Sequence, residues 1–227
     1  NSRKAWLRYR FWQPRHVRCA KRLIAISRTV ADQLVEFGAP ASDVVVVPNG
    51  IAVERPAVPA PRSQDLLVLA RHDANKNLAA LIKAFAAVQQ QLPQWRGTLR
   101  IVGRQTRLTP GLMQLVAQLP RPHQLEWLSS LTREQLIERL RSSLALVSAS
   151  TEEGFDYPVL EAKAEGIPTL ISDIAVHREF HHSSSLFFPI DDTGETLAAH
   201  IKALCSENST WLDLSHQGYA LAQAMSL

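Results

Sequence analysis

Short apolar runs alternate with amphipathic segments along almost the whole chain. The runs lie at residues 23–27, 44–47, 66–70, 99–102, 125–128, 144–147, 169–172 and 186–188. Most of them are separated by segments with helical periodicity, such as NLAALIKAFAAVQQQL and TREQLIERLRSS. Strands that read as continuous apolar runs between helices are typical of a parallel sheet covered on both faces. The pattern therefore predicts an α/β fold built on a doubly wound parallel sheet.

One stretch interrupts this alternation. Residues 49–65, NGIAVERPAVPAPRSQD, are rich in proline and have no periodicity, which is typical of a linker. Upstream of it the pattern predicts a strand, a helix closed by Gly38 and a second strand, too few elements for a domain. We therefore expect residues 1–48 to be the tail of an N-terminal domain, 49–65 an interdomain linker and 66–227 a Rossmann-like domain.

The composition disfavours several classes of protein. The 227 residues are 46% apolar and 20% charged, as in ordinary globular domains, and no apolar run is long enough for a membrane-spanning helix. Cys19 and Cys205 have no framework spacing, which favours a reduced, cytoplasmic protein. The chain contains neither G-x-G-x-x-G nor a P-loop motif, so the common NAD and P-loop classes are disfavoured.

The first 31 residues form a basic segment without acidic side chains. Its cations are Arg3, Lys4, Arg8, Arg10, Arg15, Arg18, Lys21, Arg22 and Arg28, and its aromatic residues are Trp6, Tyr9, Phe11 and Trp12. Such a segment favours peripheral contact with an anionic membrane surface, weakened by salt. The alternative is packing against other protein. Stacking on nucleic acid is a third reading, and we disfavour it.

Residues 151–166, TEEGFDYPVLEAKAEG, carry the first group of candidate site residues. They lie between two predicted strands, so they form a loop and a helix at the carboxyl edge of the sheet, where ligands of such folds bind. Glu153 is expected on the loop and Glu161 one turn into the helix, facing the same crevice. Paired carboxylates of this kind accept hydrogen bonds from the hydroxyls of ribose and hexose.

The start of this helix adds a second kind of chemistry. Asp156 is a candidate N-cap, and Pro158 suits a first helical turn. Backbone N–H groups around Gly154 and Phe155 are donors suited to an oxyanion.

A second group follows the strand at 66–70, in the sequence ARHDANKN. Arg71 and Lys76 bracket this polar loop at the same edge of the sheet. Two cations there are able to neutralise a diphosphate and stabilise it as a leaving group. Each motif alone also fits solvated surface, and it is their joint placement that favours a site.

The order VVVVPNGI, LLVLARHDANKNLAALIKAF, LRIVG and LALVSASTEEGFDYPVLEAKAEGIPTLISD resembles the C-terminal half of the group 1 (family 4), retaining glycosyltransferases of the GT-B fold. The resemblance runs from about residue 23 to the end. It identifies Glu153 and Glu161 with the E-x7-E motif of that family, and Arg71 and Lys76 with its basic pair.

The resemblance implies a role for each residue. Arg71 and Lys76 would hold the donor diphosphate, Glu153 the transferred sugar and Glu161 the ribose. The backbone near Leu128 and Ser129 would meet the base. It also implies a nucleotide-diphosphate sugar as donor, with GDP-mannose favoured, a glycan or lipid-linked acceptor from a bacterial polysaccharide or lipopolysaccharide pathway, and no metal or other cofactor.

Some features depart from the resemblance. Family members usually have Gly where this chain has Asp156, which is expected to add negative charge beside the diphosphate, and small residues or Met at Lys163. The acceptor domain and a closing helix are missing, so we expect the chain to be clipped at both ends and to transfer nothing alone.

Two other interpretations of the function remain. One is a non-catalytic nucleotide- or partner-binding module, and the other is a GT-B nucleotide-sugar epimerase, which we disfavour because its chemistry also needs both halves of the fold. A zinc site at His177 and His181, spaced i and i+4, is disfavoured because no third ligand is evident.

Overall fold

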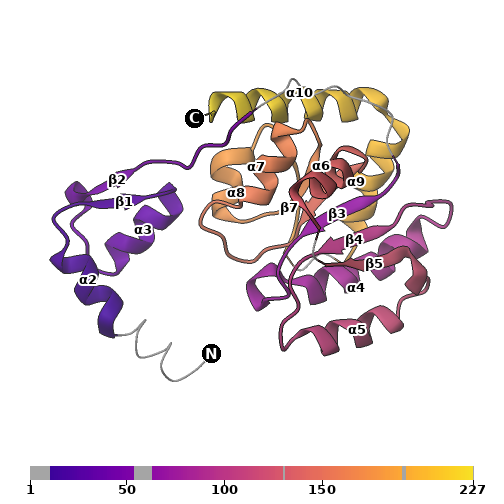
Figure 1. Ribbon diagram of the computed structural model, residues 1–227, viewed down its shortest axis with the longest axis horizontal. Coiled ribbons are helices and arrows are strands. Elements are labelled where there is room, and N and C mark those ends of the chain that lie inside the picture. Colours follow the sequence, from indigo (N-terminus) through magenta and orange to yellow (C-terminus); the bar gives the residue numbers. More distant parts are fainter. Residues whose placement is uncertain (1–10, 54–62, 130, 191–192, 227) are drawn as a thin grey trace. The chain divides into compact units, whose positions relative to one another are not determined.

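A computed structural model of the chain describes residues 11–53, 63–129, 131–190 and 193–226. By its internal contacts the chain divides into two compact units, Asn1–Asn49 and Gly50–Leu227, and each is described by itself (Figure 1). The expected assignment of residues 1–48 to an acceptor domain and of 49–65 to a linker stays a prediction.

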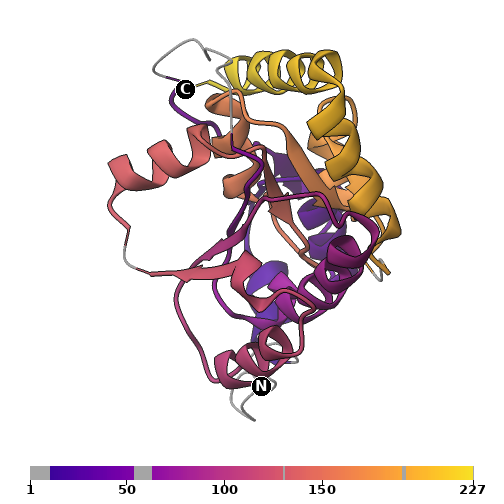
Figure 2. The same cartoon turned by 90° about the vertical axis from the view of Figure 1, so that its right-hand side faces the viewer.

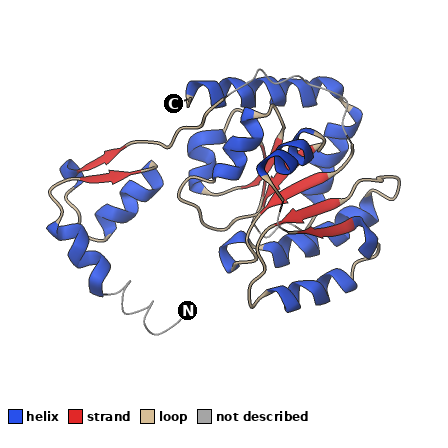
Figure 3. Cartoon of the chain, in the orientation of Figure 1, coloured by secondary structure: helices blue, strands red, loops and turns tan. Residues whose placement is uncertain are grey.

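The larger unit is a six-stranded parallel sheet with helices on both faces (Figure 3). Its strands are β3 (Leu66–Leu69), β4 (Leu99–Val102), β5 (Leu125–Leu128), β6 (Ala145–Ser148), β7 (Thr169–Ser172) and β8 (Leu186–Phe188). Its helices are α4 (Leu78–Gln91), α5 (Thr109–Ala117), α6 (Arg133–Arg141), α7 (Tyr157–Ala164), α8 (Ala175–His181), α9 (Glu195–Ser206) and α10 (Asn208–Ala224). The predicted doubly wound α/β fold is confirmed.

The strand order determines where a ligand can bind. It is β5-β4-β3-β6-β7-β8, so the chain first moves outward from β3 and then returns to its other side at β6. The loops after β3 and β6 therefore leave neighbouring strands and turn to opposite faces of the sheet. In open α/β sheets this switch point forms a crevice at the carboxyl edge.

The helices form because their apolar positions match the sheet they cover. In α4 the buried residues Leu78, Leu81, Ile82, Phe85 and Val88 recur at helical spacing. The long helix α10 packs against both α7 and α9 (Figure 2). As a result α7 is enclosed by the sheet on one side and by α10 on the other.

The smaller unit has little core of its own. It contains helix α2 (Gln13–Cys19), strand β1 (Leu23–Ala25), helix α3 (Arg28–Glu36) and strand β2 (Val44–Val46), which pairs in parallel with β1. Gly38 follows the end of α3 with a φ of +98°, in agreement with its predicted role. Ile24 is 72% exposed and Val45 47%, although parallel strands are normally covered on both faces.

The basic segment falls partly within this unit. Arg15, Arg18, Lys21 and Arg22 are exposed, and Trp12 is 59% exposed. Its other members up to Arg10 lie outside the described residues, so membrane contact stays a prediction. Among the described residues, no helix combines the length and apolar character needed to cross a bilayer.

Gly103 allows the end of β4 to pass close to the loop that carries Arg71. A Cβ atom at this position would lie 1.8 Å from the carbonyl oxygen of Ala70. We therefore expect Gly103→Ala to force the two backbones apart and to lower the free energy of unfolding by about 1–3 kcal/mol. Gly111→Ala in α5 is the matched control, because a Cβ there meets open space. Equal urea midpoints for the two variants would contradict the close approach.

Candidate functional site

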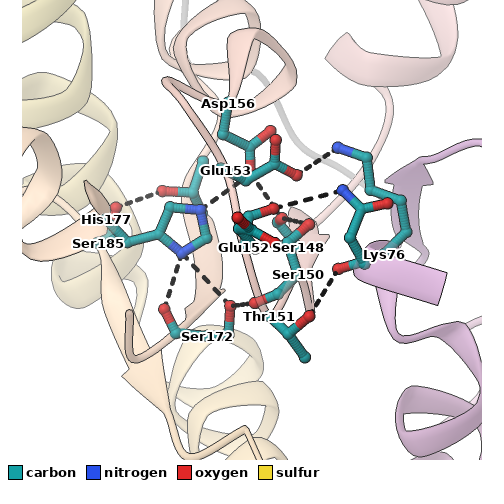
Figure 4. A network of polar contacts seen from close by, with 12 residues as sticks. Lys76, Ser148, Ser150, Thr151, Glu152, Glu153, Asp156, Ser172, His177 and Ser185 are labelled. Atoms are coloured by element: carbon teal, nitrogen blue, oxygen red, sulfur yellow. Dashed lines mark hydrogen bonds and ion pairs between the residues drawn. The ribbon is translucent and has the colours of Figure 1, made fainter. Parts of the chain in front are cut away.

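The loops after β3 and β6 are joined to each other at the switch point. The Thr151 N–H donates to the Asn75 carbonyl oxygen at 2.8 Å, and the Asn75 side-chain amide donates to the Glu152 carbonyl oxygen at 3.3 Å. Both bonds lie in the network shown in Figure 4. Two segments separated by more than seventy residues therefore form one wall at the carboxyl edge of the sheet.

Lys76 and Glu153 meet across this junction. The Lys76 ammonium donates a hydrogen bond to Glu153 Oε1 in an ion pair (Figure 4). Their side chains are 19% and 13% exposed, so both are largely withdrawn from water without being sealed from it. Sequence reasoning placed these two residues in one crevice, and the structure brings them into contact.

Arg71 lies on the same loop but points to a different partner. Its guanidinium pairs with Asp73 at 3.1 Å, and its side chain is 58% exposed. In the described part of the chain no ion pair or hydrogen bond joins Arg71 to Glu153 or Glu161. The two predicted cations therefore share a loop, with Lys76 held inward and Arg71 at the surface.

Glu161 lies on α7, the helix that follows the β6 loop, and lines a pocket there. The pocket has a volume of about 410 Å³ and extends from Gly50–Ala52 and Leu69 past α6 to Tyr157 and Glu161 on α7. Residues from Leu131 to Leu140 form its opposite wall. Of the predicted base-binding residues, Leu128 is the last residue of β5 and Ser129 follows it, and neither is part of the lining.

The turn into α7 presents unused backbone donors. Within the described residues, the N–H groups of Gly154 and Phe155 donate to no other group. Phe155 itself is 3% exposed and packs edge-on against Phe180 of α8, with ring centroids 4.9 Å apart. The side chain thus anchors the turn while its backbone stays available to an oxyanion.

Asp156 corrects two expectations. It occupies the N-cap position of α7, but its backbone is left-handed, with φ 65° and ψ 69°, and its side chain makes no cap hydrogen bond. The carboxylate is buried and accepts from Ser148 Oγ at 2.7 Å, and it pairs with His177 Nε2 at 2.9 Å. The carboxylate that was expected to add negative charge beside the diphosphate therefore lies in a buried contact with His177.

Burial raises the pKa of Asp156, but the opposing effects are larger in sum. Hydrogen bonds from His177 and Ser148, together with the positive charges of His177 and Lys76, bring the pKa below its usual range. Asp156 is therefore ionised, and His177 is the partner that sequence reasoning missed. Their separation of 21 residues gave no signal of this contact.

His177 and His181, the two histidines of the disfavoured zinc site, have different surroundings. Both ring nitrogens of His177 are engaged, Nε2 with Asp156 and Nδ1 with the Ser172 carbonyl oxygen at 2.8 Å. His181 is 1% exposed, and burial lowers its pKa to about 2. No group of three metal-capable side chains occurs in the described ranges.

A second cavity lies at the opposite edge of the sheet. Its volume is about 480 Å³, and its lining includes Gln64, which precedes β3, and Trp95, which precedes β4. Lys202 is the one cationic side chain among its lining residues, and the cavity is far along the strands from Lys76 and Glu153. We favour the switch point as the site because charged groups from two loops converge there.

Comparison with protein families gives two matches that together extend over almost the whole chain. Residues 54–220 match the family described as "Glycosyl transferases group 1". Residues 1–55 match the model described as "Glycosyltransferase Family 4".

Among curated proteins, the chain is similar to bacterial mannosyltransferases. It is 30% identical over 156 residues to the GDP-mannose:cellobiosyl-diphosphopolyprenol alpha-mannosyltransferase of Xanthomonas campestris, an alignment that covers 67% of this chain and 40% of that protein. It is 24% identical over 185 residues to the O-antigen chain mannosyltransferase RfbU of Salmonella typhimurium, covering 81% and 51%. The chain therefore spans about half or less of the length of these relatives.

Solved structures share the fold at low identity. HepE of Anabaena, in complex with UDP and glucose, superimposes with a TM-score of 0.79 at 19% identity, over 92% of this chain and 60% of that one. The pneumococcal O-GlcNAc transferase GtfA, in complex with UDP and GlcNAc, gives 0.77 at 18%, over 96% and 44%. With a family match over more than half of its length and the parallel α/β fold of these proteins, the chain belongs to the group 1 glycosyltransferases of the GT-B fold.

Proposed function

We propose that the crevice at the β3/β6 switch point binds a nucleotide-diphosphate sugar, and that the whole enzyme transfers its hexose with retention to a polysaccharide or lipopolysaccharide acceptor. The observation that carries this proposal is the contact between Lys76 and Glu153. It places a cation and a carboxylate side by side at the edge of the sheet where nucleotides bind. A cation is needed to bind the diphosphate, and a carboxylate is needed to accept a hydrogen bond from a sugar hydroxyl.

Each residue has a distinct role in the proposal. Lys76 exchanges Glu153 for the diphosphate, and Arg71 swings from Asp73 to add a second charge. Glu153, once released, accepts hydrogen bonds from the sugar. Glu161 holds the ribose hydroxyls in the adjacent pocket.

The proposed reaction uses these charges to stabilise the leaving group. The bond between C1 of the sugar and the β-phosphate oxygen breaks, and the acceptor hydroxyl forms a bond to C1 from the same face. The acceptor proton passes to a departing phosphate oxygen. Lys76, Arg71 and the N–H groups of Gly154 and Phe155 neutralise the charge that develops there, which is electrostatic catalysis and needs no metal.

The names of the relatives favour a mannosyl donor. The Xanthomonas relative is named for GDP-mannose, and RfbU is named as a mannosyltransferase of O-antigen chains. The identity of about a quarter to a third supports GDP-mannose as the donor and a cell-surface glycan as the acceptor, as proposals for the whole protein.

Calorimetric titration with GDP-mannose, UDP-glucose and ADP-glucose tests this proposal. We expect GDP-mannose to bind most tightly, with the same Kd in EDTA as in Mg²⁺. Glu161→Gln is expected to weaken binding about tenfold, because it replaces a charged acceptor of ribose hydroxyls by a neutral one. Glu138→Gln on exposed α6 surface is the matched control. Absence of binding to all three nucleotides would overturn the proposed function.

A further inference from the structure

Helix α8 holds the segment 149–156 through two neighbouring side chains. His177 and Phe180 are three residues apart, so they lie on one face of the helix. Phe180 packs against Phe155, and His177 pairs with Asp156. Two consecutive residues of the segment that carries Glu153 are therefore fixed by one helix from outside the crevice.

The local sequence explains why Asp156 turns inward. An N-cap carboxylate normally accepts the N–H of the second or third helical residue. Pro158 is the second residue of α7 and has no N–H, while the Val159 N–H donates to the Asp156 backbone carbonyl at 3.1 Å. The left-handed backbone of Asp156 then directs the carboxylate to Ser148 and His177, where the side chain is only 1% exposed.

The surroundings of His177 determine its protonation. Nδ1 lies 2.8 Å from the Ser172 carbonyl oxygen, which only accepts, so Nδ1 carries a proton. Nε2 lies 2.9 Å from Asp156 Oδ2, which also accepts a hydrogen bond from Ser148. A proton on Nε2 as well would make this contact the buried ion pair of an imidazolium with a carboxylate.

The same network links the end of β7 to the segment. Ser172 Oγ donates to the Ser150 carbonyl oxygen at 2.5 Å (Figure 4). The ion pair is completely buried, and a buried ion pair that loses one partner leaves a costly unpaired charge. The segment is thereby restricted to one conformation.

We propose that His177 is a positioning residue of the donor site, because its buried ion pair with Asp156 holds segment 149–156 so that Glu153 and the Gly154 and Phe155 N–H groups face the donor. The proposal rests on the proposed function. His177 is fully buried and, in the described residues, makes no hydrogen bond or ion pair with Lys76, Glu153 or Glu161. It acts through Asp156, which stands where the family resemblance suggests a glycine.

The test compares three variants of the 227-residue chain with the wild type, using GDP-mannose, UDP-glucose and ADP-glucose well below the melting temperature. His177→Leu leaves Asp156 unpaired and is expected to weaken the tightest donor about tenfold. Asp156→Gly/His177→Leu removes the pair without leaving an unpaired charge and accepts the left-handed backbone, so its Kd is expected to lie between those of the wild type and of His177→Leu. Asp156→Asn keeps a donor for a neutral imidazole and should stay within about threefold of the wild type.

A spectroscopic reading checks the ion pair without any ligand. In the ¹⁵N spectrum both ring nitrogens of His177 are expected to be protonated in the wild type and only Nδ1 in Asp156→Asn. A role confined to stability would change melting temperatures and leave every Kd unchanged.

The outcomes separate the two proposals. If no nucleotide-sugar binds the wild type, the proposed function fails and the positioning role fails with it. If the donor binds and His177→Leu, still folded, keeps the wild-type Kd, only the positioning role is overturned. A double variant that binds the donor as tightly as the wild type, or an unprotonated Nε2 in the wild type, would overturn it as well.

Discussion

Lys76→Met is expected to weaken binding of the nucleotide-sugar about 100-fold. A charge-assisted hydrogen bond to phosphate contributes roughly 1.5–3 kcal/mol, and this variant removes it. It also leaves the Glu153 carboxylate without its cation at the place where the diphosphate must bind. The remaining negative charge repels the ligand, so the expected loss lies at the upper end of that range.

Two further variants make this prediction specific. Lys83→Met, on the exposed side of α4, removes the same charge away from the crevice and should leave the Kd unchanged. Glu153→Gln frees Lys76 and should tighten binding of GDP, which lacks the hexose, while binding of GDP-mannose gains nothing because the contact of Glu153 with the mannose is lost. Calorimetric titration of the three variants with GDP and with GDP-mannose tests these expectations. A wild-type Kd for Lys76→Met would show that the diphosphate binds elsewhere.

Lys163→Met is expected to stabilise the fold at pH 7 by on the order of 2–4 kcal/mol. Lys163 is completely buried in α7, and the one hydrogen bond of its ammonium in the described structure goes to Ser184 Oγ at 2.6 Å. Burial lowers the pKa of Lys163 to about 7. Methionine fills a similar volume without a charge, and its cost is the hydrogen bond of Ser184.

The pH dependence of this gain follows from the sign of the shift. The unfolded chain binds a proton at Lys163 below about pH 10.5, while the folded chain does so only below about pH 7. Wild-type stability therefore rises with pH from about 7 to about 10.5, and the advantage of methionine shrinks over the same range. His181 does not interfere, because its lowered pKa places its effect on stability below pH 6.5.

Urea unfolding at pH 7 and at pH 10 measures this effect. The difference in free energy of unfolding between Lys163→Met and the wild type should be smaller at pH 10. Lys83→Met provides the baseline, since its side chain is exposed in both states. A pH-independent difference, or a loss of stability at pH 7, would mean that the folded state holds Lys163 as a well-solvated ammonium.

The apolar runs were sufficient to predict the sheet and the edge at which the site lies. Each run became a strand, and the central strands β3, β6 and β7 are almost wholly buried, as expected for largely apolar strands covered on both faces. The contact of Lys76 with Glu153 was also within reach, since parallel strands end at the same edge.

What the sequence did not reveal depends on tertiary packing. Lys163 lies in a helix buried on nearly all sides, so α7 shows no polar stripe that would mark a buried lysine. The pairing of Asp156 with His177 requires α8 to lie beside the β6 loop, and this contact depends on tertiary structure and not on any local sequence pattern. Asp156 was expected to cap α7 because capping is predicted from the local sequence. Pro158, the second residue of the helix, lacks the backbone N–H that would donate to the Asp156 carboxylate.

A crystal structure of the chain with GDP-mannose is the decisive test of the proposed donor site. We expect the diphosphate between the loops that follow β3 and β6, within hydrogen-bond distance of Lys76 Nζ, and the ribose at Glu161. Lys76 should then have left Glu153 for phosphate. A nucleotide bound instead in the cavity lined by Trp95 and Lys202, with the ion pair between Lys76 and Glu153 intact, would contradict it.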